Sequence, residues 1–270
     1  MGLRTKIIAE VSSNHGGDIN LAKEFIRSAA SLGLDYVKFQ SWQVRTLRDG
    51  AGDPQFGWLS QAELLDESHR ELIVECQKQG IRFLTTVFHP GRVPFLKSLG
   101  LDEIKIGSGE ALNGSLLRAV RGEFKNVMVS TGLALDHEVM EIVGQLEGVS
   151  FSLFHCVSLY PLALSKVNMV RMDWLKKFCP QVGYSDHTVG LDAAKLAIDR
   201  GASFVEKHFC LGRHGPGRVN AWDATPEEME SLRVYAEKVE KMVGDGKIVL
   251  DEGLSEARRL YLGRFAKPEN

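Results

Sequence analysis

The sequence lacks several features that would assign it at once to a class of protein. Its 33 Lys and Arg against 35 Asp and Glu give a formal net charge of −2, without the basic excess typical of nucleic-acid-binding domains. No run approaches the roughly 18 apolar residues of a membrane-spanning helix. The apolar stretch at residues 7–11 is shorter than the core of a signal peptide, about 7–15 residues. We therefore expect a cytoplasmic protein with no nucleic-acid or membrane partner.

Cysteine is also scarce, and the usual cofactor motifs are missing. The four cysteines, at 76, 156, 179 and 210, are far apart and form no CxxC pair, so we expect free buried thiols in a reducing compartment. The segment after residue 10 reads Val-Ser-Ser-Asn-His-Gly-Gly and contains no GxGxxG dinucleotide fingerprint.

The sequence does contain a regular alternation of short apolar runs and stretches of helical period. The runs are residues 7–11, 36–39, 83–87, 103–106, 127–129, 149–154, 182–184 and 204–205; helical patterns between them include 21–32, 68–79, 114–121, 136–146 and 191–199. Strand–helix units of about 30 residues indicate parallel strands with crossover helices. Eight units predict an α/β protein with one (β/α)8 (TIM) barrel over residues 1–243. An open doubly wound sheet is the alternative, and residues 244–270 are expected to be a polar appendage.

Polar residues stand at the carboxyl ends of all eight expected strands, where barrel enzymes place their active sites. Lys38 and Lys105 lie in apolar strands, where an unpaired ammonium group is costly to bury. Either they form salt bridges to a carboxylate such as Glu10 or Glu206, or they belong to a pocket for a small phosphorylated or carboxylated substrate. Hydroxyl groups that would complete such a pocket come from Ser108, Ser130 and Ser185.

Two histidines end the last two expected strands, which are adjacent in a barrel. His187 and His208 would place two neutral imidazoles a few ångströms apart, an arrangement that suits a divalent transition metal. Glu10 or Glu206 could add oxygen ligands or bind the water of the metal. Four other histidines are expected on the surface or in loops: His69, His89, His137 and His214.

Taken in order, these segments resemble the sialic acid synthases, the N-acetylneuraminate synthase-like enzymes. The resemblance runs from residue 7 to about residue 209. Its most specific elements are Gly-Tyr-Ser-Asp-His-Thr-Val-Gly at 183–190 and Glu-Lys-His-Phe at 206–209, in order with Lys-Phe-Gln at 38–40.

The resemblance implies a transferase of carbohydrate biosynthesis that joins phosphoenolpyruvate to an aldose, such as N-acetylmannosamine or another aldehyde. The products are a 3-deoxy-2-ulosonic acid and phosphate. It implies that His187 and His208 bind a Mn2+-type ion, with Mg2+ or Co2+ as alternatives. It implies catalytic roles for Glu10, Glu206 and Tyr160, and Glu206 is our choice to orient or deprotonate the attacking water. The implied substrate contacts are Asn14, Lys38, Gln40, Thr86, Lys105, Ser108, Ser130, Ser158 and Ser185.

The departures from the family pattern lie on the sugar side of the site. Residues 244–270 resemble the linker to an antifreeze-like domain, which in family members supplies an arginine to the partner subunit's sugar pocket. Gly16 and Gly17 stand where many members carry Glu or Asn, and residues 215–223 follow the pattern only in part. The acceptor therefore stays open, as does a homodimer, which is common in the family. Two alternative functions are a metal-dependent 2-keto acid aldolase or lyase and a non-catalytic barrel that serves as a partner subunit.

Overall fold

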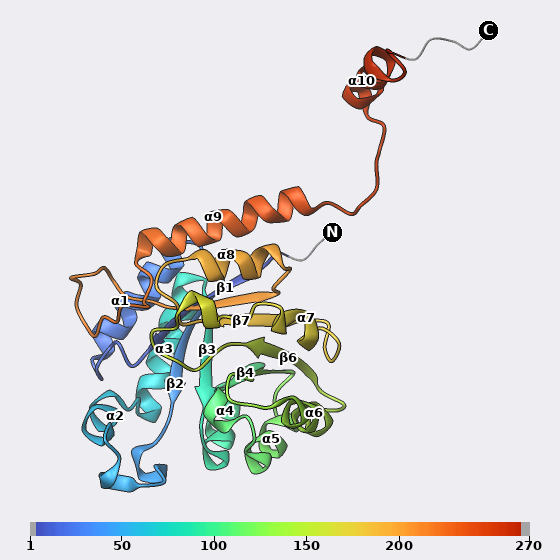
Figure 1. Cartoon of the computed structure of the whole chain (residues 1–270). Helices are drawn as coiled ribbons and strands as arrows, with labels where there is room; N and C mark the ends of the chain where they lie inside the picture. Colours follow the sequence, from blue (N-terminus) through green and yellow to red (C-terminus); the bar gives the residue numbers. More distant parts are fainter. Residues whose placement is uncertain (1–3, 266–270) are drawn as a thin grey trace.

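Eight parallel strands close into a barrel in the computed structural model, which describes residues 4–265 (Figure 1). The strands follow one another in chain order, and β1 pairs with β8 to close the ring. The predicted (β/α)8 barrel is confirmed, and the open doubly wound sheet is wrong. The strands are β1 (Lys6–Ser12), β2 (Tyr36–Ser41), β3 (Arg82–Val87), β4 (Glu103–Ile106), β5 (Asn126–Ser130), β6 (Ser150–His155), β7 (Val182–Asp186) and β8 (Phe204–His208).

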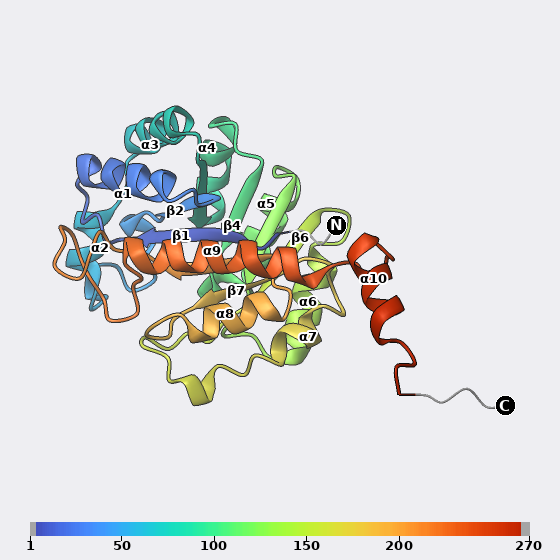
Figure 2. The same ribbon diagram turned by 90° about the horizontal axis from the view of Figure 1, so that it is seen from above.

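Helices follow the strands and cover the outside of the barrel (Figures 1 and 2). In the first of them, Asp18 caps the amino end by accepting hydrogen bonds from the backbone N–H groups of Asn20 and Leu21. Its buried residues recur at helical spacing: Ala22, Phe25, Ile26 and Ala29. The α-helices are α1 (Ile19–Ser31), α2 (Phe56–Ala62), α3 (Asp66–Gln79), α4 (Val93–Ser98), α5 (Gly114–Arg121), α6 (Asp136–Gln145), α7 (Arg171–Leu175), α8 (Asp192–Asp199), α9 (Pro226–Val243) and α10 (Glu252–Tyr261).

The alternation of side chains along each strand separates the main core from the barrel interior. In β1, Ile7, Ala9 and Val11 face outward and belong to the core between sheet and helices, whereas Ile8 and Glu10 point inward. Six buried apolar side chains form a separate cluster inside the barrel: Ile8, Tyr36, Leu84, Met128, Phe154 and Phe204. Toward the carboxyl ends of the strands the inward-facing residues are polar, and the candidate site lies at this end of the barrel.

One of the four histidines expected on the surface is buried. The ring of His69 on α3 packs between Phe83 and Phe95, with centroids 6.4 and 5.7 Å away, and is fully inaccessible to solvent. The surface prediction is wrong for His69 because it lies on the side of α3 that faces the barrel. It is confirmed for the exposed His89, His137 and His214.

The last helix lies apart from the barrel (Figure 1). Helix α10 buries no residue, whereas α9 packs on the barrel through Met229, Leu232, Ala236 and Val239. The predicted boundary at residue 243 coincides with the end of α9. The likeness of the appendage to a linker stays a prediction, and residues 1–3 and 266–270 of the predicted ranges lie outside the described residues.

Within residues 4–265, no helix combines the length and apolar character needed to cross a membrane. All four cysteines are buried and free, as predicted.

Candidate active site

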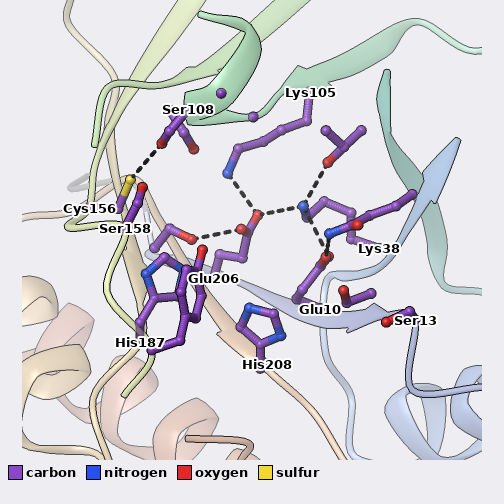
Figure 3. Close-up of a pocket in the computed structure, with 18 of the residues that line it drawn as sticks. Glu10, Ser13, Lys38, Lys105, Ser108, Cys156, Ser158, His187, Glu206 and His208 are labelled. Carbon is purple, nitrogen blue, oxygen red and sulfur yellow. Dashed lines mark hydrogen bonds and ion pairs between the residues drawn. The ribbon is translucent and has the colours of Figure 1, made fainter. Parts of the chain in front are cut away.

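A cavity of about 390 Å³ opens at the carboxyl ends of the strands (Figure 3), within the usual size range of small-molecule sites, roughly 300–1,000 Å³. Its wall includes every residue predicted for the site. These residues are Glu10, Asn14, Lys38, Gln40, Thr86, Lys105, Ser108, Ser130, Ser158, Tyr160, Ser185, His187, Glu206 and His208. The members that lie on strands meet because inward positions of neighbouring parallel strands lie at the same level, and Asn14, Ser108, Ser158, Tyr160 and His187 come from the loops that follow the strands. Their individual roles stay predictions.

Glu206 of β8 is the centre of a buried chain of charges (Figure 3). Its Oε2 accepts a hydrogen bond from Lys105 Nζ at 2.7 Å and lies 3.4 Å from Lys38 Nζ, while its Oε1 accepts one from Ser185 Oγ at 2.7 Å. Burial alone would raise the pKa of Glu206, but the charges of Lys105 and Lys38 outweigh it and hold that pKa well below its ordinary value. Glu206 is therefore ionised at neutral pH.

Glu10 of β1 lies at the other end of this chain of charges. Its Oε2 is 2.9 Å from Lys38 Nζ, and its Oε1 accepts a hydrogen bond from Gln40 Nε2 at 2.7 Å. Lys38 also donates to Thr86 Oγ1 at 2.9 Å. Burial raises the pKa of Glu10 to about 7; Lys38 opposes this rise and the charge of Glu206 adds to it. Glu10 is thus the carboxyl group of the pair that can exchange a proton near neutral pH.

The salt bridges offered as one explanation for the two lysines are confirmed, and the substrate pocket offered as the other stays a prediction. The salt bridges of Lys38 and Lys105 to Glu10 and Glu206 are present, and both ammonium groups also line the cavity. Lys105 Nζ lies 3.5 Å from the centroid of the Phe154 ring, so the charged layer rests directly on the apolar cluster inside the barrel.

His187 and His208 lie next to each other, with ring centroids 5.6 Å apart. His187 Nδ1 is 2.9 Å from the carbonyl oxygen of Val157, which assigns the proton to Nδ1 and leaves Nε2 as a free electron-pair donor. His208 Nδ1 is buried without a hydrogen-bond partner among the described residues. Burial lowers the pKa of both rings, and His187 further lowers that of His208. Both rings are therefore neutral, the state that binds metal.

An aromatic wall stands beside the histidines. The Tyr160 ring lies 4.1 Å from His187 and 5.5 Å from Trp222, centroid to centroid, and the residue is 49% exposed. Trp222 Nε1 is buried without a hydrogen-bond partner in the part of the chain that the structure describes. Such a wall suits the body of a small ligand that also needs polar contacts.

Ser108, Gly132, Cys156 and Ser158 pack closely together in another part of the cavity wall. Ser108 Oγ lies 3.2 Å from Cys156 Sγ and accepts a hydrogen bond from the Gly132 N–H at 3.1 Å. A Cβ atom on Gly132 would lie 2.5 Å from Cys156 Sγ and 2.8 Å from Ser158 Oγ. Glycine at position 132 therefore allows the backbone after β5 to approach these hydroxyl groups.

Asn14 directs its side-chain amide into the protein framework. Its Nδ2 donates to the carbonyl oxygen of Phe209 at 3.0 Å and to Asp223 Oδ2 at 3.1 Å. The backbone carbonyl oxygen of Asn14 accepts a hydrogen bond from the backbone N–H of Arg218 at 2.8 Å. Asn14 thus joins the β1–α1 loop to the β8–α9 connection (residues 209–225), while its role as a substrate contact stays a prediction.

The sequence had given no role to several residues around the mouth of the cavity. Arg218, Asn220 and Trp222 line it from the β8–α9 connection. Trp58 of α2 lines an adjoining cavity and donates from Nε1 to Ser13 Oγ at 2.9 Å. The partial departure of residues 215–223 from the family pattern is the one sequence signal for Arg218, Asn220 and Trp222, and no signal points to Trp58.

Known proteins resemble the chain over nearly its whole length. The family model described as "NeuB family" matches residues 25–248. An N,N'-diacetyllegionaminic acid synthase of Campylobacter jejuni is 36% identical over 262 residues, which cover 90% of this chain and 78% of that protein. A pseudaminic acid synthase of the same organism is 30% identical, with 97% and 82% covered. A solved N-acetylneuraminic acid (sialic acid) synthetase of Leptospira borgpetersenii superposes with a TM-score of 0.89 at 31% identity, covering 97% of this chain and 93% of that one.

Proposed function

This chain belongs to the NeuB family, and on that basis we propose that it condenses phosphoenolpyruvate with an aldose to form a 3-deoxy-2-ulosonic acid and phosphate. The methylene carbon of phosphoenolpyruvate would form a bond to the aldehyde carbon. Water would add to the enol carbon, and the bond from that carbon to the phosphate oxygen would break. The relatives named as synthases of legionaminic, pseudaminic and N-acetylneuraminic acids support this reaction.

The observation that carries the proposal is the buried pair of lysines at the base of a cavity. Lys38 and Lys105 are 3% and 1% exposed and face the cavity from β2 and β4. Their ammonium groups, together with hydroxyl groups of Ser108, Ser130 and Ser185, would donate hydrogen bonds to the oxygens of a phosphorylated carboxylate. A fixed, water-poor arrangement of this kind stabilises developing charge without reorganisation.

We assign different roles to the two carboxylates of the site, Glu206 and Glu10. Glu206 accepts three contacts, from Lys105, Lys38 and Ser185, so we assign it to hold the lysines in place. Glu10 has fewer donors and lies on the same cavity wall. We therefore assign Glu10, in place of our sequence-based choice of Glu206, to take the proton from the attacking water.

The histidine pair fits a divalent metal ion, for which we propose Mn2+. The neutral rings, the Nδ1 bond of His187 and the unpartnered Nδ1 of His208 agree with a ligand role. The described residues contain no group of three or more His, Cys, Asp or Glu that could hold a metal, so the remaining ligands would be water or substrate. When bound, such an ion supplies Lewis acidity toward the aldose carbonyl.

The test is phosphate release from phosphoenolpyruvate in the presence of Mn2+ and a panel of aldoses that includes N-acetylmannosamine. We expect release only when all three components are present, and loss of release in Lys105→Met. Turnover of pyruvate added in place of phosphoenolpyruvate, with no phosphate release, would favour the 2-keto acid aldolase or lyase. Absence of any phosphoenolpyruvate binding by calorimetry would favour the non-catalytic barrel.

The metal assignment has a readout of its own. We expect His187→Ala and His208→Ala each to weaken Mn2+ binding, measured by calorimetry, by about tenfold or more. The exposed His137→Ala is the matched control and should bind as the wild type does. Unchanged Mn2+ binding in both site variants would reject the assignment. Location in the cytoplasm and a homodimer stay proposals from the sequence.

A further inference from the structure

One cation at the cavity mouth has no carboxylate partner. Among the described residues that line the cavity, Lys38 and Lys105 are paired with Glu10 and Glu206. No acidic oxygen of the described chain lies within 4.0 Å of the Arg218 guanidinium. The neighbouring Arg213, by contrast, donates to Glu228 at 2.8 Å.

The backbone of Arg218 is held rigidly at the mouth. Its N–H donates to the carbonyl oxygen of Asn14 at 2.8 Å. The preceding Gly217 has φ +86°, and a Cβ there would lie 2.4 Å from that same oxygen. Only glycine permits this close approach, so the β8–α9 connection reaches the β1–α1 loop with Arg218 directly at the contact.

The side chain of Arg218 is exposed and lies over the Trp58 indole. Its guanidinium carbon lies 5.2 Å from the Trp58 ring centroid, and the Trp58 indole is tied to Ser13 by its hydrogen bond. Stacking on an aromatic ring restrains the guanidinium while leaving its N–H donors free to bind in the plane of the group.

Arg218 also marks the junction of two cavities. The site cavity and an adjoining cavity of about 550 Å³ share Asn14 and Arg218 in their walls. The wall of the second cavity also includes Trp58 and Gln61 of α2 and Asp18. The Asp18 carboxylate is engaged as the cap of α1. A ligand that extends outward from the site therefore passes the free guanidinium.

We propose that Arg218 binds an anionic group of the acceptor aldose, a phosphate or carboxylate carried at the end of the sugar remote from its aldehyde. The proposal rests on the proposed function and names the class of its second substrate. The lysines at the base of the cavity are already opposed by two carboxylates and serve the inner reactant. Arg218 lies at the mouth, on the connection after β8, and its planar fork matches either anion with two hydrogen bonds.

The experiment measures acceptor binding separately from turnover. The probes are the alditol of N-acetylmannosamine 6-phosphate and the unphosphorylated alditol, which lack an aldehyde and cannot react. Each is titrated by calorimetry into the full chain with phosphoenolpyruvate and Mn2+ present. The alditol of the corresponding uronic acid separates phosphate from carboxylate recognition.

We expect the wild type to bind at least one anionic alditol about tenfold more tightly than the neutral one. Arg218→Ala should abolish this difference, and Arg218→Lys should restore part of it. Arg213→Ala, an arginine of the same connection with an acidic partner, should retain it. In steady-state assays, Arg218→Ala should raise KM for the anionic aldose and leave KM for phosphoenolpyruvate unchanged.

Equal binding of neutral and anionic alditols by the wild type would overturn the proposal, as would absence of binding by all of them. A preference that survives in Arg218→Ala, or a rise confined to KM for phosphoenolpyruvate, would overturn it too. If phosphate is released from phosphoenolpyruvate with neutral aldoses but not with anionic ones, the proposed condensation stands and the proposed role of Arg218 is rejected.

Discussion

Four buried charges set the properties of the site at the scale of single residues. Glu10, Lys38, Glu206 and Lys105 alternate in sign, and each is no more than 6% exposed. Removing one member leaves its neighbour charged and without a partner in a medium of low polarity, which costs far more than an exposed salt bridge contributes.

Glu206→Leu should therefore lower the free energy of unfolding by about 3–5 kcal/mol, because it strands Lys105. The double variant Glu206→Leu with Lys105→Met replaces the pair by apolar groups and should recover most of that loss. Urea unfolding at pH 7.5 measures both. Additive losses in the double variant would contradict the coupling between these two side chains.

His69 gives stability a defined pH dependence. Burial lowers its pKa from 6.5 to about 4, and the Arg92 charge contributes to the shift. Below pH 6.5 the unfolded chain therefore binds a proton that the folded chain does not. The free energy of unfolding should fall by about 1.4 kcal/mol per pH unit from this group between pH 6.5 and 4. The pKa of the buried His15, also about 4, adds a similar loss.

His69→Asn, whose amide can replace the bond from Nδ1 to the Leu65 carbonyl oxygen at 2.9 Å, should flatten this dependence. Urea unfolding at several values between pH 7 and 4.5 would show it. The exposed His137→Asn serves as control and should keep the wild-type slope. If the free energy of unfolding of His69→Asn falls with pH as steeply as that of the wild type, the pH dependence arises from other groups.

At the scale of elements, the β1–α1 loop contacts the β8–α9 connection, although the two segments lie far apart in the sequence. Asn14 makes this contact by donating to Phe209 and Asp223, and Asn220 adds a hydrogen bond from its Nδ2 to Asn14 Oδ1 at 3.4 Å. The closing pair of strands, β1 and β8, is thus reinforced above the sheet by side-chain bonds. The contact between the β1–α1 loop and the β8–α9 connection therefore shapes the mouth of the cavity.

Asn14→Ala should lower the free energy of unfolding by about 1–3 kcal/mol, because the buried Phe209 carbonyl oxygen loses its donor and the buried Asp223 carboxylate loses one of its donors. The substitution should also raise KM for the aldose more than KM for phosphoenolpyruvate, because the β8–α9 connection that it loosens lines the mouth of the cavity. Asn20→Ala, an exposed position on α1, is the control. Equal changes in the two KM values would contradict a role confined to the outer wall.

The strands and the site were readable from the sequence because both depend on alternation. Apolar residues marked each strand, and Lys38 or Glu206 stood out as charges at inward positions. The connections were less readable. Helix α2 lies in a long segment between β2 and α3, and its packing depends on Trp58 reaching Ser13, a contact between segments 45 residues apart. No local pattern indicates such a contact, and for the same reason Arg218 was not assigned.

At the scale of the whole molecule, the barrel and the last helix differ sharply in burial. Residues 244–265 are almost entirely exposed, and their apolar members Ile248, Val249 and Leu250 contact solvent. A segment that buries so little surface contributes little to the stability of the barrel.

A chain that ends at residue 245 should therefore unfold within about 2 °C of the full chain. Differential scanning calorimetry at two protein concentrations would measure this. A decrease in Tm of more than about 5 °C, which corresponds to about 1 kcal/mol or more for a chain of this size, would contradict the expectation. If that decrease depends on protein concentration, the segment packs against a second copy of the chain.

The apolar cluster inside the barrel has a kinetic consequence. Ile8, Tyr36, Leu84, Met128, Phe154 and Phe204 plug the interior beneath Lys105, so the cavity has one entrance. If phosphoenolpyruvate binds at the base of the cavity and the aldose at its mouth, the two substrates must bind in order, phosphoenolpyruvate first. An aldose that binds first blocks the entry of phosphoenolpyruvate. Excess aldose should then inhibit the reaction in competition with phosphoenolpyruvate.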